Sequence, residues 1–307
     1  MNELFIILKD IILPVFVIIS VGFLMQRKFN LNVQTLARLN IYYLVPGFIF
    51  VKLYTTKLSF SIFYSVILFF VLYVLVLYLV SLISSKILKL KTGEKTAFTN
   101  SVLFYNSGNY GVPVNDLVFK SDPFAMSIQV LILTFQNIFL FSYGIFTLQS
   151  VKIGKIKAML AYFKMPVLYA MLLGISLNIF HIPIPNFIWI PANYTADAMV
   201  ALALLTLGAQ VATIKFKTGL STVYASLFLR LILGPVLALG LILLFRIDGV
   251  MAQALLIGAA MPTSVNSAVI AQEYDNHPEL AAQIVLFSTA LSAITVSIVI
   301  FLSKILF

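Results

Sequence analysis

Two short polar runs interrupt apolar segments of the chain, and their residues could hold an anion without a charged side chain. They are Asn106-Ser107-Gly108-Asn109-Tyr110-Gly111-Val112-Pro113 and Met261-Pro262-Thr263-Ser264-Val265-Asn266-Ser267. Proline lacks an N–H and clashes with the carbonyl four residues earlier, so a helix is expected to stop near Asn109 and a half-helix to start at Pro113. In a bilayer such breaks persist only where they line a cavity or hold a ligand.

The start of each half-helix presents free N–H groups and roughly half a positive charge. Two starts that meet near the middle of the membrane attract an anion, and nearby amides and hydroxyls add neutral donors. This chemistry suits a carboxylate. The residues predicted to bind substrate are Asn106, Ser107, Gly108, Asn109, Gly111, Pro113, Pro262, Thr263, Ser264, Asn266 and Ser267. The structural alternative is that Asn and Ser only satisfy freed backbone groups, as in ordinary kinked helices.

A second set of residues is predicted to couple an ion or to line the cavity: Gln136, Gln210, Arg230, Gln272 and Glu273. Arg230 lies deep in an apolar segment, where a charge is costly and needs a partner. It either neutralises an acid or helps to hold an anion. Glu273 follows the second break and is a candidate acceptor for a coupling proton. Hydrogen bonding between helices is the structural alternative for Gln136 and Gln210, and a purely structural role is the alternative for Arg230 and Glu273.

The elements that position these residues are transmembrane helices. Hydrophobic residues make up 62% of the 307 residues and charged residues 10%, and the mean hydropathy is +1.07, far from the values of a soluble domain. Ten stretches approach the ~20 residues that cross a bilayer: 4–25, 36–54, 61–86, 97–119, 124–149, 161–180, 195–214, 220–245, 250–273 and 279–305. The sequence predicts an all-α integral membrane protein with ten spans and a retained first helix.

The positive charge is a topology signal. The net charge is +10, but Lys and Arg are scattered through short loops rather than gathered on one face, which argues against nucleic-acid binding. The connections after odd-numbered spans hold 13 of the 20 Lys and Arg residues. By the positive-inside rule these connections are cytoplasmic, so a multi-pass protein of the cell membrane with both termini outside is expected. The proline-rich connection His181 to Asn193 then also lies outside.

Proline and glycine recur at similar places in the two halves of the chain: Pro14 and Pro166, Gly47 and Gly208, Pro113 and Pro262. Because five spans is an odd number, a second copy must enter the membrane inverted. We predict two inverted five-helix repeats, 1–150 and 151–307, in which spans four and nine are broken and cross at their prolines. Spans one, two, six and seven would form a scaffold panel, and spans three to five and eight to ten a transport unit. Chance alignment is the alternative, since proline and glycine are common in membrane helices.

Enzyme and pump functions find no support in the motifs. The chain has no P-loop, no His-Glu-x-x-His and no Gly-x-Ser-x-Gly motif. It also has no cysteine, which removes thiolate metal sites. No cofactor or metal is expected beyond a coupling ion, H+ or Na+. A channel would need a continuous polar face along several helices, whereas the polarity here is concentrated at two breaks.

The two runs, together with Ala271-Gln272-Glu273-Tyr274-Asp275-Asn276-His277-Pro278, resemble the auxin efflux carrier family, whose bacterial members resemble organic-acid permeases. The resemblance spans essentially the whole chain. It implies ten helices in two inverted repeats, an architecture like that of bile-acid/sodium symporters and NhaA, with a carboxylate at the crossing of helices four and nine. Asn106, Pro113 and Pro262 fall on the family's crossing motifs. Plant members typically have Lys at the position of Gln272, an acid in span three and Asn at the position of Val167.

Together these features predict a secondary active transporter of small organic anions. The substrates would be mono- or dicarboxylates such as malate, or auxin-like carboxylates, with Asn106 and Asn266 in contact with them. The scarcity of acidic ligands near the breaks favours proton over sodium coupling, but carbonyls and hydroxyls at broken helices also bind sodium. A sodium-coupled symporter and a gated channel or uniporter remain as alternatives. The expected partners are the substrate and the lipid bilayer, and a homodimer through a repeat face is a further alternative.

Overall fold

The computed structural model describes residues 2–56, 60–120, 122–144, 147, 166–214 and 221–307. The α-helices are α1 (Asn2–Ile7), α2 (Leu13–Phe29), α3 (Val33–Leu39), α4 (Val45–Thr55), α5 (Phe60–Ile87), α6 (Thr92–Leu103), α7 (Val112–Phe119), α8 (Pro123–Phe139), α11 (Pro166–Ile179), α12 (Asn186–Thr213), α13 (Ser221–Phe228), α14 (Gly234–Leu244), α15 (Gly249–Ala259), α16 (Val265–Glu273) and α17 (Pro278–Leu306). These ranges contain no β-strand. The predicted boundary between the halves, at residues 150–151, lies outside the described residues.

Seven helical stretches are long and apolar enough to cross a membrane. They are Glu3–Phe29, Val33–Thr55, Phe60–Ile87, Pro123–Gly144, Asn186–Thr213, Ser221–Leu244 and Pro278–Leu306. Pro166–Ile179 and Gly249–Ala259 are shorter apolar helices. The prediction of an all-helical protein with several membrane-crossing helices is therefore confirmed for the described residues.

Five wide π-helical turns interrupt these helices: η1 (Leu8–Ile12), η2 (Asn40–Leu44), η3 (Ser107–Gly111), η4 (Leu140–Gly144) and η5 (Leu229–Leu233). Four of them are followed by an α-helix with proline at its second residue, namely Pro14, Pro46, Pro113 and Pro235. Proline cannot donate to the carbonyl four residues earlier, so the preceding turn widens instead of ending. Pro14 therefore lies inside a continuing helical stretch, Glu3–Phe29, and does not open it.

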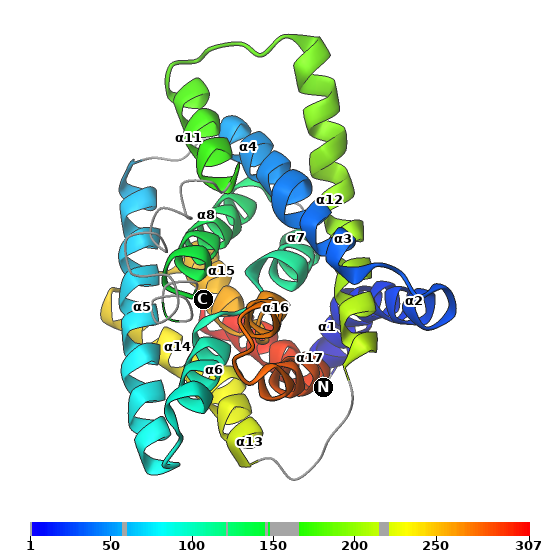
Figure 1. Ribbon diagram of the computed structural model, residues 1–307. Coiled ribbons are helices and arrows are strands. Elements are labelled where there is room, and N and C mark those ends of the chain that lie inside the picture. Colours follow the sequence, from blue (N-terminus) through cyan, green and yellow to red (C-terminus); the bar gives the residue numbers. More distant parts are fainter. Residues whose placement is uncertain (1, 57–59, 121, 145–146, 148–165, 215–220) are drawn as a thin grey trace.

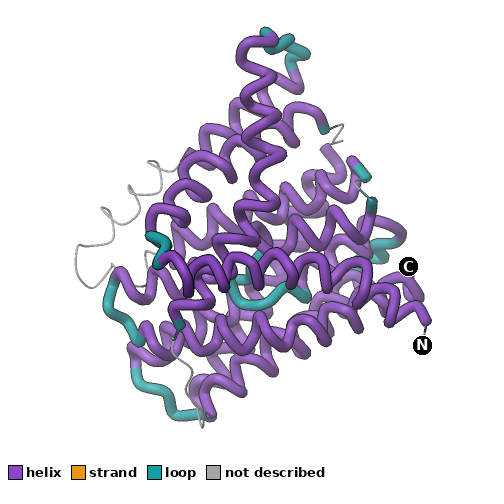
Figure 2. Tube along the Cα trace, turned by 90° about the vertical axis from the view of Figure 1, so that its right-hand side faces the viewer, coloured by secondary structure: helices purple, strands orange, loops and turns teal. Residues whose placement is uncertain are grey.

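Two helical stretches are broken in the middle of the molecule. One break separates α6 from η3 and covers Phe104 to Asn106, and the other separates α15 from α16 and covers Ala260 to Ser264. Figure 2 shows non-helical segments inside the helical body as well as at its ends. The first break comes earlier than the predicted stop near Asn109, because η3 already resumes the helix at Ser107 and leaves Pro113 inside the first turn of α7.

The helices α2, α4, α11 and α12 pack directly on one another, with α12 against both α2 and α4, and α11 against α4. Figure 1 shows α4 between α11 and α12 at the top of the view. The α2–α12 contact is very close, because a Cβ added at Gly22 would lie 2.1 Å from the Leu205 carbonyl oxygen, and one at Gly208 would lie 1.9 Å from that of Ile19. Only glycine permits this approach of two backbones.

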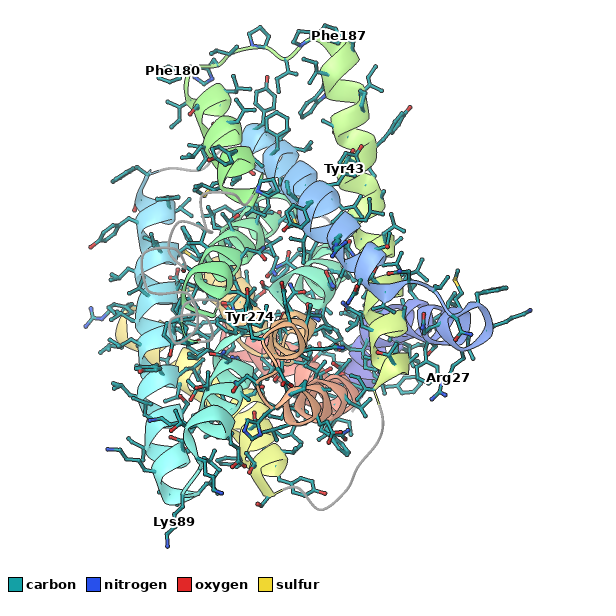
Figure 3. All side chains as sticks on the ribbon, viewed as in Figure 1. Arg27, Tyr43, Lys89, Phe180, Phe187 and Tyr274 are labelled. Carbon is teal, nitrogen blue, oxygen red and sulfur yellow. The ribbon has the colours of Figure 1, made fainter. Side chains whose placement is uncertain are left out.

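The start of α12 differs from the sequence prediction. The helix begins at Asn186 rather than near residue 195, so most of the connection predicted between His181 and Asn193 is helical. Pro191 lies inside this helix, where it removes one backbone hydrogen bond. Phe180 and Phe187 lie at this end of the molecule, and Lys89 lies at the opposite end (Figure 3).

Candidate functional site

The two breaks hydrogen-bond to each other through their backbones. The Asn106 N–H donates to the Pro262 carbonyl at 2.8 Å, and the Ser264 N–H donates to the Phe104 carbonyl at 2.7 Å. These two bonds form an antiparallel bridge between Tyr105 and Thr263. Backbone groups that the broken helices cannot satisfy are thus paired across the crossing, as burial requires.

Side chains satisfy the carbonyls at the ends of the two broken helices. The Thr263 hydroxyl donates to the Ser101 carbonyl at 2.9 Å, and the Gln136 amide donates to the Leu103 carbonyl at 3.1 Å. Arg230, on η5, donates to the Val102 carbonyl at 3.1 Å and also to the Ala259 carbonyl. The ends of α6 and α15 are therefore held by the same guanidinium group.

Replacement of Thr263 by valine is expected to lower the free energy of unfolding by about 1–2 kcal/mol, because the buried Ser101 carbonyl loses its donor while side-chain volume is kept. Thermal unfolding of the purified protein in detergent measures the change. Thr295→Val is the control, since the Thr295 hydroxyl returns to its own helix. Equal melting temperatures for the two variants would contradict this role of Thr263.

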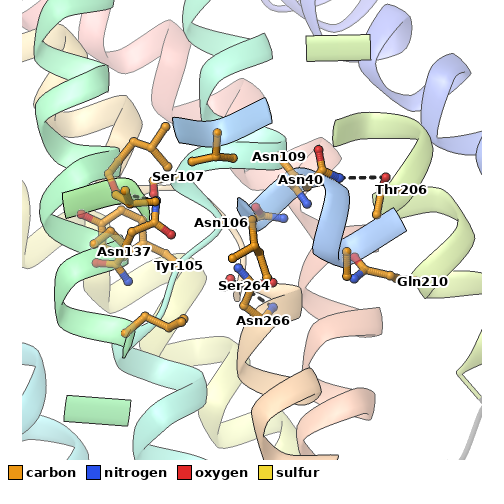
Figure 4. Close-up of a pocket in the computed structure, with 18 residues that line it drawn as sticks. Asn40, Tyr105, Asn106, Ser107, Asn109, Asn137, Thr206, Gln210, Ser264 and Asn266 are labelled. Carbon is orange, nitrogen blue, oxygen red and sulfur yellow. Dashed lines mark hydrogen bonds between the residues drawn. The ribbon is translucent and has the colours of Figure 1, made fainter. Parts of the chain in front are cut away.

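A cavity lies beside the bridge, between the breaks and the surrounding helices (Figure 4). The residues that line it are Ala37, Asn40, Ile41, Val45, Tyr105, Asn106, Ser107, Gly108, Asn109, Leu133, Gln136, Asn137, Leu140, Val167, Thr206, Gln210, Ser264 and Asn266. They come from α3, η2 and α4, from the first break and η3, from α8, η4, α11 and α12, and from the start of α16. The cavity is thus bounded by both breaks and by the α4–α12 wall.

The lining of the cavity carries no charged side chain among the described residues, and seven of its members are Asn or Gln. A carboxamide offers both donors and an acceptor, so this lining can bind a polar group of either sign. The half-helix starts at Ser107 and Val265 add the positive end of a helix dipole on two sides. Taken together, the lining favours an anion that also presents hydrogen-bonding groups.

Several polar atoms of the lining are buried without a hydrogen-bond partner: Asn40 Oδ1, Asn106 Nδ2, Gln136 Oε1 and Gln210 Oε1. The four residues are each at most 4% exposed. An unsatisfied buried polar group costs about 1–3 kcal/mol. A ligand or water that supplies their partners is therefore stabilised in this cavity.

The cavity is narrow in this conformation. The space open to the centre of a water molecule is about 30 Å3, which suffices for about two waters. The Asn40 amide donates to the Thr206 hydroxyl at 2.8 Å and ties η2 to α12 along one wall. A molecule larger than a few atoms enters only if the walls move apart.

The structure brings part of the predicted site together. Eight predicted residues line the cavity: Asn106, Ser107, Gly108, Asn109, Ser264, Asn266, Gln136 and Gln210. The others support the breaks or lie away from the cavity: Gly111, Pro113, Pro262, Thr263, Ser267, Arg230, Gln272 and Glu273. Gln272 and Glu273 are exposed at the end of α16.

The supporting residues have identifiable roles. The Gly111 N–H donates to the Asn106 carbonyl, and a Cβ at Gly111 would lie 2.6 Å from Gln129 Nε2. Gln129 itself donates to the Ser107 carbonyl at 2.7 Å. The Ser264 side chain caps α16, and the Ser267 hydroxyl donates to the Ser264 carbonyl at 2.7 Å. These contacts fix the shape of the breaks on which the cavity is built.

Asn40, Tyr105 and Thr206 also line the cavity, and none of them was predicted from the sequence to do so. A signal for Asn40 exists in the chain, because it lies in the π-helical turn that precedes Pro46, just as Ser107 lies in the turn that precedes Pro113. In these two turns a polar residue lies six positions before the proline. Nothing comparable marks Tyr105 or Thr206.

The sequence of the chain matches one known protein family. A family model described as membrane transport protein matches residues 7–155 and 149–300, which is nearly the whole chain. The chain belongs to this family. Members of the family are membrane transporters rather than enzymes, so the predicted resemblance and the prediction of a non-enzymatic transport protein are both confirmed.

Individual relatives agree with membership in the membrane transport protein family. The chain is 29% identical to auxin efflux carrier component 6 of Arabidopsis thaliana over 41% of its own length, and it spans only 23% of that protein. It is 25% identical to an uncharacterized transporter of Methanothermobacter thermautotrophicus over 93% of its length and 95% of the relative. A transporter of Methanocaldococcus jannaschii is 29% identical over 38% of the chain.

Proposed function

We propose that the protein is a secondary active transporter of small organic anions, mono- or dicarboxylates, that binds its substrate in the cavity beside the crossing. The observation that carries the proposal is the lining itself: seven carboxamides, two half-helix starts and no charged side chain among the described residues. Four buried polar atoms of the lining have no hydrogen-bond partner, which a bound substrate would supply. A carboxylate and its polar substituents supply both acceptors and donors to such a lining.

An inverted repeat of two five-helix halves is part of this proposal. Phe104 and Asn106 pair with Ser264 and Pro262, and the corresponding members of these pairs, 104 with 262 and 106 with 264, are each 158 residues apart. The close contacts also correspond, because α2 meets α12 through Gly22 while α11 meets α4 through Gly174. The two halves are therefore aligned by this spacing of 158 residues and not by matching Pro113 with Pro262. Pro113 follows the first break, whereas Pro262 lies within the second.

Alternating access follows from the same arrangement. The helices α2, α4, α11 and α12 would form the scaffold panel, and the crossing with its neighbours would move against it. The Asn40–Thr206 hydrogen bond and the narrow cavity support an occluded state, in which the cavity is closed to both sides of the membrane. Lys89 lies at the end opposite to Phe180 and Phe187, which supports a cytoplasmic α5–α6 connection and an α11–α12 connection on the other side of the membrane.

The proposal is tested by uptake of labelled carboxylates, malate first, into proteoliposomes of the purified protein. A proton gradient and a sodium gradient are imposed separately. We expect accumulation above the external concentration with a proton gradient, because no carboxylate lines the cavity to bind sodium among the described residues. Accumulation driven by sodium would make it a sodium symporter, and equilibration without accumulation would make it a uniporter or channel. No flux of any carboxylate would overturn the substrate class.

Asn106→Ala and Asn266→Ala are each expected to raise the substrate concentration for half-maximal uptake about tenfold, since each removes a neutral donor from the cavity. Maximal uptake per folded molecule should change less. Asn186→Ala, at an exposed position at the start of α12, is the control. Unchanged apparent affinity in both cavity variants would exclude these side chains from substrate contact.

A further inference from the structure

Arg230 is a full positive charge buried at the crossing of the broken helices. Its side chain is 0% exposed. The guanidinium donates to the carbonyls of Val102 and Ala259 and, at 2.5 Å, to the hydroxyl of Tyr73. No described carboxylate pairs with it, so the partners of this cation are the carbonyls at two helix ends and one phenol.

The balance of partial charges at the crossing depends on Arg230. Each helix C-terminus carries roughly −0.5 of a charge and each N-terminus roughly +0.5. The C-termini of α6 and α15 together carry about one negative charge, which the guanidinium neutralises. The two helix starts at η3 and α16, which contribute Ser107 and Asn266 to the cavity lining, then remain as about one uncompensated positive charge. Without Arg230 the four helix ends would sum to zero.

A single side chain separates Arg230 from the cavity. The guanidinium carbon lies 4.9 Å from the centre of the Tyr105 ring, and Tyr105 lines the cavity. The ring of Tyr73 lies 5.7 Å away on another side. Arg230, Tyr73 and Tyr105 are each at most 3% exposed, so the charge acts across the tyrosine with less screening than at the protein surface.

Tyr73 and Arg230 occupy corresponding places in the two halves of the chain, with an offset one residue shorter than that of the two breaks. Tyr73, on α5, donates to the Ala259 carbonyl at 3.2 Å, while Arg230 donates to the Val102 carbonyl. Tyr73 and Arg230 are 157 residues apart, and so are Val102 and Ala259. A side chain from each half of the chain thus donates to a helix-end carbonyl of the other half. In the second half that side chain is charged, and in the first half it is neutral.

We propose that Arg230, without touching the substrate, is the residue that makes the neutral cavity selective for anions. It is a positioning residue that holds both helix ends and leaves the positive helix starts uncompensated. The inference rests on the anion site of the proposed function, but its test measures the potential of the cavity without any transported substrate.

The absence of cysteine from the chain makes the test direct. Asn109→Cys places a single thiol on the cavity lining. Its modification rate is measured with two methanethiosulfonate reagents of similar size, one anionic (ethylsulfonate) and one cationic (ethyltrimethylammonium). The ratio of the two rates reports the local electrostatic potential, and it is determined with Arg230, Arg230→Lys and Arg230→Met. Arg246→Met, at an exposed position, is the control for loss of an arginine.

We expect the anionic-to-cationic rate ratio to fall about tenfold in Arg230→Met, as for loss of a nearby charge at an intermediate dielectric. Arg230→Lys keeps the charge but cannot donate to both the Val102 and Ala259 carbonyls as the guanidinium does. The anionic-to-cationic rate ratio of this variant should therefore stay within about threefold of that of the parent. An unchanged ratio in Arg230→Met, or an equal fall in Arg230→Lys, would overturn the inference. If neither reagent modified Asn109→Cys with Arg230 in place, the inference would also be overturned, because a cavity that admits neither ion cannot select between them.

Folding is measured separately, since Arg230→Met leaves two buried carbonyls without a donor. The Arg230→Met rates are interpreted only if this variant elutes as a monodisperse species and shows a clear melting temperature. If it does not fold, the Arg230→Lys ratio alone decides, because a fall of about tenfold with the charge present would contradict an electrostatic role. Uptake of the labelled carboxylates is not used here, so a wrong substrate class and a wrong role for Arg230 give different results.

Discussion

Replacement of Gly208 by alanine is expected to destabilise the protein by about 3 kcal/mol or more. The added Cβ would lie 1.9 Å from the Ile19 carbonyl oxygen and 2.8 Å from the Phe23 nitrogen, so α12 and α2 must separate along their closest contact. Backbone atoms cannot rotate away as a flexible side chain can. The change is measured as a lower melting temperature in detergent and as a loss of monodisperse protein.

Gly240→Ala is the matched control for this prediction. Gly240 also lies in an apolar helix, α14, but a Cβ there would meet no heavy atom within 4 Å. Alanine favours a helix over glycine by up to about 1 kcal/mol, so this variant should be as stable as the parent or more stable. If both substitutions lowered the melting temperature equally, the close approach of α2 and α12 would not be the cause.

Gln210→Glu is expected to reduce the apparent affinity for a carboxylate about a hundredfold. The two side chains have nearly the same shape, so the variant adds a negative charge and changes little else. Gln210 lines the cavity and its Oε1 atom has no partner. A like charge about 6 Å from a bound carboxylate costs roughly 3 kcal/mol at an effective dielectric near 20.

The pH dependence of this variant separates charge from shape. Protonation of the introduced carboxyl restores a neutral group, so the deficit relative to the parent should shrink as the pH falls. Uptake is therefore compared with that of the parent at each pH. Gln34→Glu adds the same charge at an exposed position on α3 and serves as the control. A deficit that persists at every pH would indicate a steric effect.

The sequence was sufficient to predict the helical membrane architecture and the two breaks. Long apolar stretches and polar runs with proline are local signals, and the forces that produce them act within about one helical turn. The position of the first break was wrong by several residues. Pro113 widened the helix into a π-helical turn instead of ending it, and the backbone bridge to Pro262 and Ser264 determined where the helix stops.

The remainder of the site depends on contacts between distant segments. Asn40 faces the cavity because η2 packs against α12, and the sequence gives no sign of that packing. Arg230 was recognised as a costly charge that needs a partner, but its partners are backbone carbonyls of other helices, which no residue type reveals. The roles predicted for Gln272 and Glu273 stay predictions, since both side chains are exposed at the end of α16.

The backbone bridge has a consequence for biogenesis. Its partners, Phe104 with Ser264 and Asn106 with Pro262, belong to opposite halves of the chain. During synthesis the first break enters the membrane long before the second exists, with its amide and carbonyl groups still unpaired. The nascent first half must therefore keep that segment hydrated or shielded by the insertion machinery until the second half arrives. Completion of the binding site is then one of the last steps in the maturation of the protein.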